Sequence, residues 1–166
     1  MRWKQSDYTG WGRVHSATGD LARPERASTL AALVRDDPAP AIGMRRSYGD
    51  APLNSGGRAV DMSRLDRVLS FDETTGSVHV EAGLQIGQLL KTFAPKAWLP
   101  PVMPGTGFAT VGGGIGMDVH GKNHHGAGSF GCHIEDLTLM TPGGPKTVKP
   151  DTALFKATVG GLGQTG

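Results

Sequence analysis

The sequence predicts an α+β fold, with a small mixed or parallel sheet and helices packed on it. Strand-like apolar runs and segments with helical spacing alternate in the order strand, helix, strand, strand, helix. The chain has 166 residues, which is long enough for one domain with a core of its own or for two small lobes. A third observation is a stretch over residues 104–131 that is rich in Gly and poor in large apolar side chains. Such a stretch is typical of backbone that lies close to a ligand.

Composition narrows the class of protein. The formal net charge is +2, and Lys and Arg do not gather in a run with interleaved aromatic residues, so we expect no nucleic-acid partner. The single cysteine, Cys132, excludes an intrachain disulfide and is expected to be a small buried thiol. We see no apolar signal region and no run of about 18 apolar residues, so we expect no transmembrane segment. The expected location is the cytoplasm or the periphery of the cell envelope.

Periodicity and turn residues place the elements. Residues 1–20 are expected to be an extended lead-in whose aromatic side chains dock on the body. Ser28 is expected to cap a helix in which Leu30, Leu33 and Val34 follow helical spacing. Strands are expected over 21–25, 41–44, 59–62, 77–83 and 134–141, with a hairpin partner at 146–148, and helices over 29–36, 86–93 and 151–159. The chain ends in a Gly-rich segment without a closing element, which predicts a domain truncated at its C-terminus.

The loop after the strand at 41–44 is a candidate anion site. It reads Arg45-Arg46-Ser47-Tyr48-Gly49-Asp50. A tight loop with Ser, Gly and free backbone N–H groups can hold an anion, and the arginines would add charge-assisted hydrogen bonds to a pyrophosphate. The alternative is an ordinary surface turn with solvated arginines.

The Gly-rich stretch contains Gly112-Gly113-Gly114-Ile115-Gly116. This run does not complete the dinucleotide fingerprint of a Rossmann fold, and prolines lie where the preceding strand should be. Instead, residues 110–113 are expected to open a short helix whose N–H groups face a pyrophosphate.

Histidines follow in the same stretch, at His120, His124 and His125, with His133 close behind. A metal site is one interpretation, but the glycines around His120 argue against a helix that would hold two of these ligands together. Positioning of a redox ring or of sugar hydroxyls fits these side chains better, with Lys122 and Asn123 adding a cation and an amide. A third interpretation is that they only satisfy loop backbone groups.

Four segments together resemble a known family. They are GWGR at 10–13, MRRSYGDAPLN at 44–54, the whole stretch 104–131, and FKATVGGLGQTG at 155–166. The chain is similar, from about residue 9 to its end, to FAD-linked oxidases of the vanillyl-alcohol-oxidase family, whose FAD-binding domain is of the PCMH type. Within that family it is most similar to the members that oxidise a polyprenyl-phosphoryl ribose.

The resemblance implies a PCMH-type FAD-binding domain of two α/β lobes, here with a lead-in at 1–20, a first lobe at 21–100 and an incomplete second lobe at 101–166. It implies two catalytic residues on the substrate side of the flavin, His120 and Lys122. The cofactor-binding residues that it implies are Gly43, Arg46, Ser47, Tyr48, Gly49, Gly105, Thr110, Val111, Gly112, Gly113, Met117, Asp118, Val119 and His120. No metal is implied.

The resemblance also implies a reaction. The C2′ hydroxyl of a polyprenyl-phosphoryl ribose would be oxidised by hydride transfer to FAD, for cell-wall arabinan synthesis, with a partner reductase as an open question. Tyr48 stands where several relatives carry a histidine bonded to the flavin, which implies non-covalent FAD. The alternatives are an aldonolactone or alditol oxidase, or an FAD-binding module without turnover, because the family's substrate domain has no counterpart in these residues.

Overall fold

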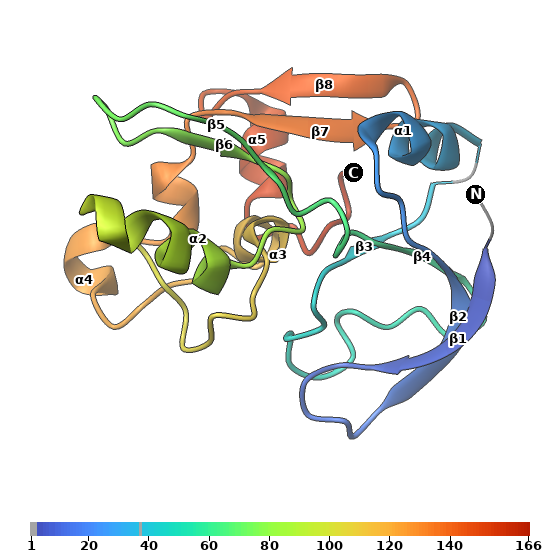
Figure 1. The fold of residues 1–166 in the computed structure, drawn as a ribbon. Coiled ribbons are helices and arrows are strands. Elements are labelled where there is room, and N and C mark those ends of the chain that lie inside the picture. Colours follow the sequence, from blue (N-terminus) through green and yellow to red (C-terminus); the bar gives the residue numbers. More distant parts are fainter. Residues whose placement is uncertain (1–2, 37) are drawn as a thin grey trace.

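The computed structural model describes residues 3–36 and 38–166. The elements form two groups side by side, and a C-terminal hairpin lies across the top of both in Figure 1. Helices and strands are mixed in each group, as an α+β fold requires.

The first group is a four-stranded mixed sheet in the order β1-β2-β4-β3. Its strands are β1 (Lys4–Thr9), β2 (Ser16–Ala22), β3 (Ala41–Ile42) and β4 (Arg58–Asp61). β1 runs antiparallel to β2, while β2 and β3 both run parallel to β4. The mixed sheet is therefore confirmed, and β4 lies at its centre between two parallel neighbours.

The described residues from 3 onward that were expected to form an extended lead-in belong to this sheet, and the expected docking of aromatic side chains on the body is confirmed for Tyr8. β1 and most of β2 lie there, and Tyr8 is buried in the core of the sheet. The strand expected at 21–25 is the end of β2, which finishes at Ala22. Polar residues in both strands, and Gly19 in β2, hid the alternation that marks a strand.

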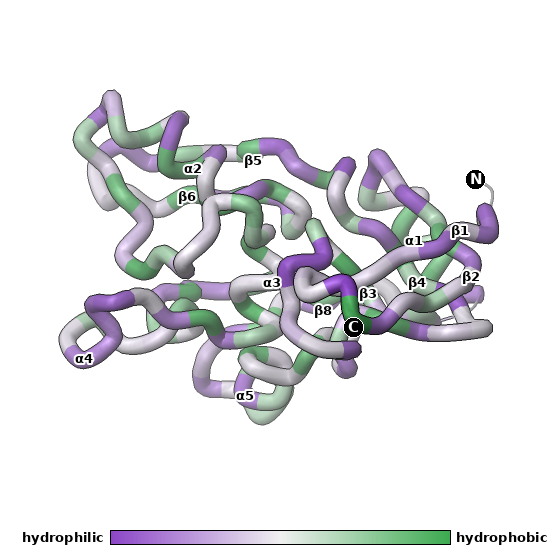
Figure 2. The backbone as a smooth tube through the Cα atoms, turned by 90° about the horizontal axis from the view of Figure 1, so that it is seen from below, coloured by the Kyte–Doolittle hydropathy of each residue, from purple (hydrophilic) through white to green (hydrophobic). Residues whose placement is uncertain are grey.

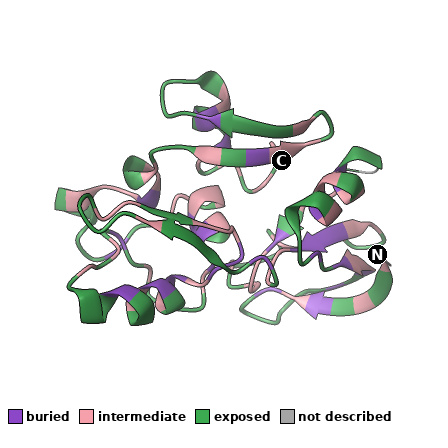
Figure 3. Cartoon of the chain, turned by 45° about the horizontal axis from the view of Figure 1, so that its top comes forward, coloured by how far each residue is buried: buried purple, intermediate pink, exposed green. Residues whose placement is uncertain are grey.

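Helix α1 (Ala27–Asp36) covers one face of the sheet, with Leu30 and Val34 packed beside Val60 and Leu65. The predicted helix is confirmed, but it begins one residue before Ser28, which lies inside its first turn rather than at the N-cap. Figure 3 shows the buried residues gathered in the sheet and on the inner faces of the helices.

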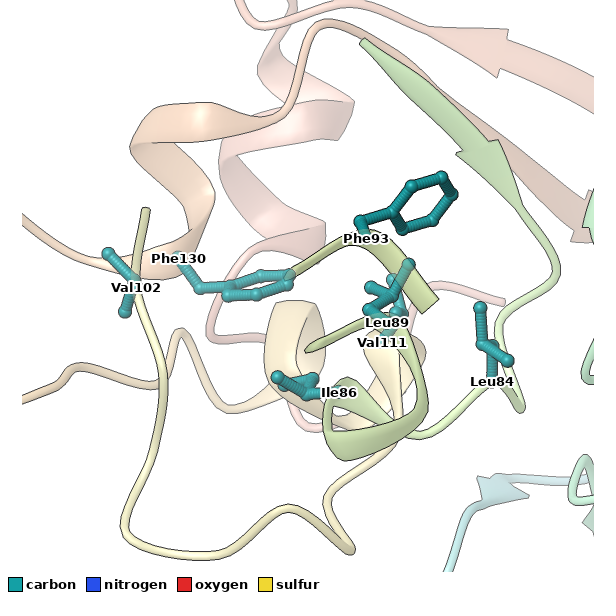
Figure 4. Close-up of a cluster of buried hydrophobic side chains, with 7 residues drawn as sticks. All are labelled: Leu84, Ile86, Leu89, Phe93, Val102, Val111 and Phe130. Carbon is teal, nitrogen blue, oxygen red and sulfur yellow. The ribbon is translucent and has the colours of Figure 1, made fainter. Parts of the chain in front are cut away.

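The second group surrounds a separate hydrophobic core, drawn in Figure 4. Its helices are α2 (Ile86–Phe93), α3 (Val111–Gly116) and α4 (His124–Ala127), with 3₁₀ turns at η1 (Ala94–Lys96) and η2 (Phe130–His133). The core residues are Leu84, Ile86, Leu89, Phe93, Val102, Val111 and Phe130. They come from both sides of the lobe boundary expected at residue 100. The bounds of α2 match the sequence prediction, and its apolar spacing is the clearest in the chain.

Two antiparallel ribbons and one helix complete the chain. They are β5 (Val68–Phe71) with β6 (Val78–Val80), β7 (Leu137–Thr141) with β8 (Gly144–Val148), and α5 (Ala153–Thr158). The predicted hairpin is confirmed, and His79 lies exposed on β6 as expected. Helix α1 contacts β7, so the hairpin joins the two groups.

The C-terminal segment is held against the body. The N–H groups of Gly160 and Leu162 donate to the carbonyls of Ile115 and Gly116 in α3, at 2.9 and 2.8 Å. Figure 2 shows this segment passing close to α3 and β3. A Cβ placed on Gly163 would lie 3.7 Å from the carbonyl oxygen of Ala41. The last residues are therefore part of the junction between the two groups.

Candidate functional site

The loop from Arg45 to Asp50 leaves β3 at the junction between the two groups of elements. Its six amide N–H groups donate to no acceptor within residues 3–36 and 38–166. Arg45 and Gly49 both have positive φ, 54° and 61°, so the backbone changes hand at each end of the loop. Successive N–H groups without acceptors in a loop of this kind can bind an anion.

The β3–α3 junction brings together two residues that are far apart in the sequence, Gly43 and Thr110. A Cβ on Gly43 would overlap the Oγ1 of Thr110 and would lie 3.1 Å from its Cγ2. Thr110 is buried and caps α3, since its Oγ1 accepts the N–H of Gly113 at 3.1 Å. Gly43 is thus required for the loop to start against the N-terminus of α3.

The short helix expected after Thr110 is confirmed as α3, but its first amides already have partners. The N–H groups of Val111 and Gly112 donate to the carbonyls of Leu84 and Ala82, both at 2.8 Å, and that of Gly113 donates to Thr110. The expectation that these N–H groups face a pyrophosphate is therefore wrong. What this segment offers a ligand is close backbone approach, because Gly113 is exposed and carries no side chain.

A contact across the junction links the two glycine-rich segments. The guanidinium carbon of Arg46 lies 5.1 Å from the centre of the Phe108 ring, and the Phe108 side chain is 56% exposed. Stacking of this kind holds a cation by the ring's electron-rich face. Sequence reasoning missed Phe108, and a lone aromatic residue in a Gly-rich loop gave no signal for it.

The segment from Met117 to His120 continues from α3 toward α4. Asp118 has a positive φ of 42°, and its Oδ1 accepts the N–H of Gly131 at 2.9 Å. Phe130 donates its N–H to the carbonyl of Val119 at 2.8 Å, so this segment is paired with the start of η2. The Asp118 carboxylate therefore accepts a hydrogen bond from within the protein, so its side chain has a structural role.

His120 and Lys122 belong to the segment that connects α3 to α4, and His120 forms an isolated β-bridge with Ser129. Both side chains are exposed. The rings of His120 and His124 meet edge to face with centroids 5.2 Å apart, and the Nδ1 of His124 lies 3.2 Å from the carbonyl of Gly121. That carbonyl can only accept, so Nδ1 of His124 carries the proton.

The other candidate residues, His133 and Cys132, form no hydrogen bond or ring contact with His120 or Lys122, within the part of the chain that the structure describes, that would make a shared site. His133 bonds the carbonyl of Ala127 through Nε2 at 2.8 Å. Cys132 is exposed, so the prediction of a buried thiol is wrong; it sits on a surface 3₁₀ turn rather than in the core. Among the described residues, no group of three or more His, Cys, Asp or Glu is placed to hold a metal ion. No helix in that part of the chain is both long and apolar enough to cross a membrane.

These features fit a long ligand with a pyrophosphate at its middle, such as FAD. The loop at 45–50 supplies unpaired N–H groups and the arginines supply positive charge. Gly105 faces open space, since nothing lies within 4 Å of a Cβ placed there, and Gly113 is exposed at the start of α3. Backbone at such glycines can approach a flat ring closely.

Comparison with known proteins agrees with this fit. Residues 21–149 match the model of the FAD binding domain family. The chain is 45% identical to decaprenylphosphoryl-beta-D-ribose oxidase from Mycolicibacterium smegmatis over 95% of its own length. It is 26% identical to D-lactate dehydrogenase from Anaerostipes hadrus, over 68% of this chain and 23% of the dehydrogenase.

Among solved structures, alkyldihydroxyacetonephosphate synthase superposes with a TM-score of 0.74 at 18% identity, covering 87% of the chain. That likeness shows a shared fold. The chain spans about a third of the length of these relatives, 36% of the oxidase and 31% of the synthase.

Proposed function

The chain belongs to the family of FAD-binding domains, and from that premise we propose that it is the flavin-holding part of an FAD-dependent oxidoreductase acting on a polyprenyl-phosphoryl ribose. The observation that carries the proposal is the 45% identity, over nearly the whole chain, to an oxidase named for such a substrate. When bound, FAD would supply the redox chemistry, accepting a hydride from the C2′ carbinol carbon of the sugar.

Within this proposal the loop at 45–50 holds the pyrophosphate. Its N–H groups supply hydrogen bonds and Arg46 supplies a charge-assisted one. Ser47 belongs to the same loop, and its hydroxyl adds a further donor to the pyrophosphate oxygens. The unpaired state of these six amides supports the assignment, because N–H groups without acceptors gain most from an anionic ligand.

The wall formed by Gly105 and by residues 110–113 and 117–120 lines the rest of the flavin. Glycines on this wall admit the ring at backbone distance. His120 and Lys122, at the far end, face the sugar: the lysine attracts the substrate phosphate or polarises a hydroxyl, and the histidine takes up the hydroxyl proton as the carbinol is oxidised. Both side chains are exposed, which a role toward an incoming substrate needs.

Non-covalent attachment follows from Tyr48 in this proposal. A phenol at that position gives no ring nitrogen to bond the flavin, and the Tyr48 side chain is 77% exposed against Trp11. Acid precipitation of the purified holoprotein tests the point, because non-covalent FAD is released into the supernatant. Flavin that stays with the precipitate would favour the aldonolactone or alditol oxidases instead.

The reaction is tested in two steps on the longest reading frame that contains this chain. Binding of FAD to the apoprotein is measured first, by equilibrium dialysis and by the flavin absorbance of the complex. Bleaching of that absorbance is then followed without oxygen after addition of a short-chain polyprenyl-phosphoryl ribose. A protein that binds no FAD refutes the cofactor part, whereas bleaching by D-lactate or an aldonolactone, but not by the phosphoryl ribose, refutes the substrate.

A second function has a specific observation behind it. Because the chain covers only 36% of the oxidase that it resembles, we propose as the second candidate that these residues alone act as an FAD-binding module without turnover. In that case the 166-residue chain binds FAD and no sugar bleaches it, while the longer reading frame is active.

A further inference from the structure

We infer that the turn between β1 and β2 is part of the pyrophosphate site, with Gly10 and Trp11 as positioning residues that fix the direction of the loop amides. The inference rests on the proposed FAD site. The turn itself touches the backs of the loop peptides and needs no contact with the ligand.

The first contact is a hydrogen bond from the N–H of Trp11 to the carbonyl of Ser47, at 3.1 Å. In a planar trans peptide the C=O and the following N–H point in opposite directions. Because the carbonyl of Ser47 points at the turn, the N–H of Tyr48 points away from it. That direction leads out of the β1–β2 turn, to the side of the loop where its amides have no acceptor.

The second contact is made by Gly10. A Cβ placed on Gly10 would lie 2.7 Å from the carbonyl oxygen of Gly49 and 3.2 Å from that of Ser47. Both carbonyls therefore pack directly on the Cα of Gly10. By the same peptide geometry, the N–H of Asp50 points away from the turn, parallel to that of Tyr48. Two carbonyls face the turn, and two amides consequently face the anion.

Side chains of β1 and the turn hold the rest of the loop in place. The Trp11 ring meets the Tyr48 ring edge to face, with centroids 5.6 Å apart. The buried Tyr8 accepts the N–H of Asn54 at 2.9 Å through its hydroxyl oxygen. The segment from Ser47 to Asn54 is therefore attached to β1 and its turn at both ends. A loop fixed in this way loses less entropy when it binds an anion.

The chain offers a matched control, because Gly12 lies in the same turn. A Cβ on Gly12 would meet only the Cγ2 of Val14, at an ordinary 3.8 Å. Gly10→Ala is therefore expected to push the carbonyls of Ser47 and Gly49 away, and Gly12→Ala is not. Neither glycine has a positive φ, so the two substitutions differ only in what the new methyl group meets.

The experiment measures the affinities of the wild type, Gly10→Ala and Gly12→Ala for FAD, ADP and riboflavin, on the full reading frame. Losing two hydrogen bonds to a charged group corresponds to a loss of about tenfold or more in affinity. We expect that loss for Gly10→Ala with FAD and ADP, no loss with riboflavin, which has no phosphate, and wild-type values throughout for Gly12→Ala. The phosphorus NMR signals of bound FAD should also shift in Gly10→Ala.

A second pair guards against a fold defect in Gly10→Ala. Trp11→Ala removes the ring that braces Tyr48 and should weaken ADP binding severalfold, while Trp11→Phe keeps an aromatic edge and should restore it. Equal ADP affinity in Gly10→Ala and Gly12→Ala, or an equal loss with riboflavin, would overturn the inference. A wild type that binds FAD in none of these assays would instead defeat the proposed function on which the inference rests.

Discussion

Asp61 is buried at the end of β4, and the Nε and Nη2 atoms of Arg23 both lie against one of its carboxylate oxygens, at 2.9 and 2.7 Å. The other oxygen accepts the N–H of Ser63 at 3.0 Å. Asp61 pairs in register with Ile42 of β3, immediately before the segment that leads into the loop at 45–50. This ion pair thus supports the strand that delivers the candidate anion site.

Replacing Arg23 with Gln should destabilise the protein, because the buried Asp61 carboxylate would lose its cation. The Arg23 side chain is 45% exposed, so water moderates the effect, and we expect a loss of about 1–3 kcal/mol in the free energy of unfolding, measured by urea titration. Arg64→Gln is the control: its ion pair with Glu25 is exposed on both sides and should cost less than about 1 kcal/mol. Equal losses in the two variants would contradict the role of burial.

Gly43→Ala should separate β3 from α3, because its methyl group overlaps the Thr110 hydroxyl that caps the helix. We expect a loss of about 2 kcal/mol or more in the stability of the apoprotein, from overpacking and from loss of the cap together. Thermal unfolding of the apoprotein measures it. Gly143→Ala, where the nearest atom is a Thr141 hydroxyl at 3.7 Å, should leave the unfolding temperature unchanged. A stable Gly43→Ala variant would show that the junction can adjust.

Asp118 gives a test of what its side chain does. Asp118→Asn keeps an oxygen for the N–H of Gly131 and tolerates a positive φ, so stability and FAD affinity should stay near wild type. Asp118→Ala loses the hydrogen bond and strains the backbone, and it should cost about 1–3 kcal/mol of unfolding free energy. Chemical denaturation and flavin titration of both variants distinguish the roles. A large loss of FAD affinity in Asp118→Asn would mean that the carboxylate itself contacts the cofactor.

Stability should fall in acid through Glu81. The Arg67 side chain holds both carboxylate oxygens, at 2.9 and 2.6 Å, and this hydrogen bonding lowers the pKa of Glu81 in the folded protein. A carboxyl with a lowered pKa stabilises the fold above its unfolded pKa, about 4.3 for Glu, and that contribution is lost as the pH falls through the folded pKa. Glu81→Gln should therefore flatten the loss of unfolding free energy below about pH 5.

The matching variant for that prediction is Arg67→Gln, which should flatten the acid profile to the same degree, as should the double variant. Some acid dependence should persist in all three, because hydrogen bonds from Thr74 and Thr75 lower the pKa of Asp72 as well. Unfolding free energies measured by urea between pH 3 and pH 7 give the profiles. An unchanged profile in Glu81→Gln would exclude this ion pair as a source of acid sensitivity.

Local signals in the sequence were enough for some elements and failed for others. Helix α2 follows from four apolar residues at helical spacing, and the short helix α3 opens at 110–113 as the sequence predicted. β1 and β2 carry few apolar residues, and their pairing with each other and with β4 supplies what their own pattern lacks. α4 has only four residues, one of which is a glycine and one an alanine, and a segment this short cannot show helical periodicity.

Part of the candidate site was likewise predictable from local sequence, and part of it was not. The loop at 45–50 could be found because Ser, Gly and Arg after a buried strand are a local pattern. The contacts of Gly10 with Gly49, of Arg46 with Phe108 and of Gly43 with Thr110 join segments distant in sequence, so only the folded chain shows them. The engaged amides of α3 depend likewise on carbonyls at Ala82 and Leu84 that no motif around Thr110 could reveal.

The C-terminal segment at the β3–α3 junction has a consequence for biosynthesis. Gly163 lies beside Ala41 and Gly116, so this part of the junction cannot close until residue 163 has left the ribosome. Contacts between such distant residues carry a high loop-closure cost and form slowly. The first sheet can fold on its own core, whereas the β3–α3 junction also requires residues 160–163. Uptake of the flavin should therefore follow closure of this junction, and free FAD should raise the yield of refolded protein most when it is present while the junction forms.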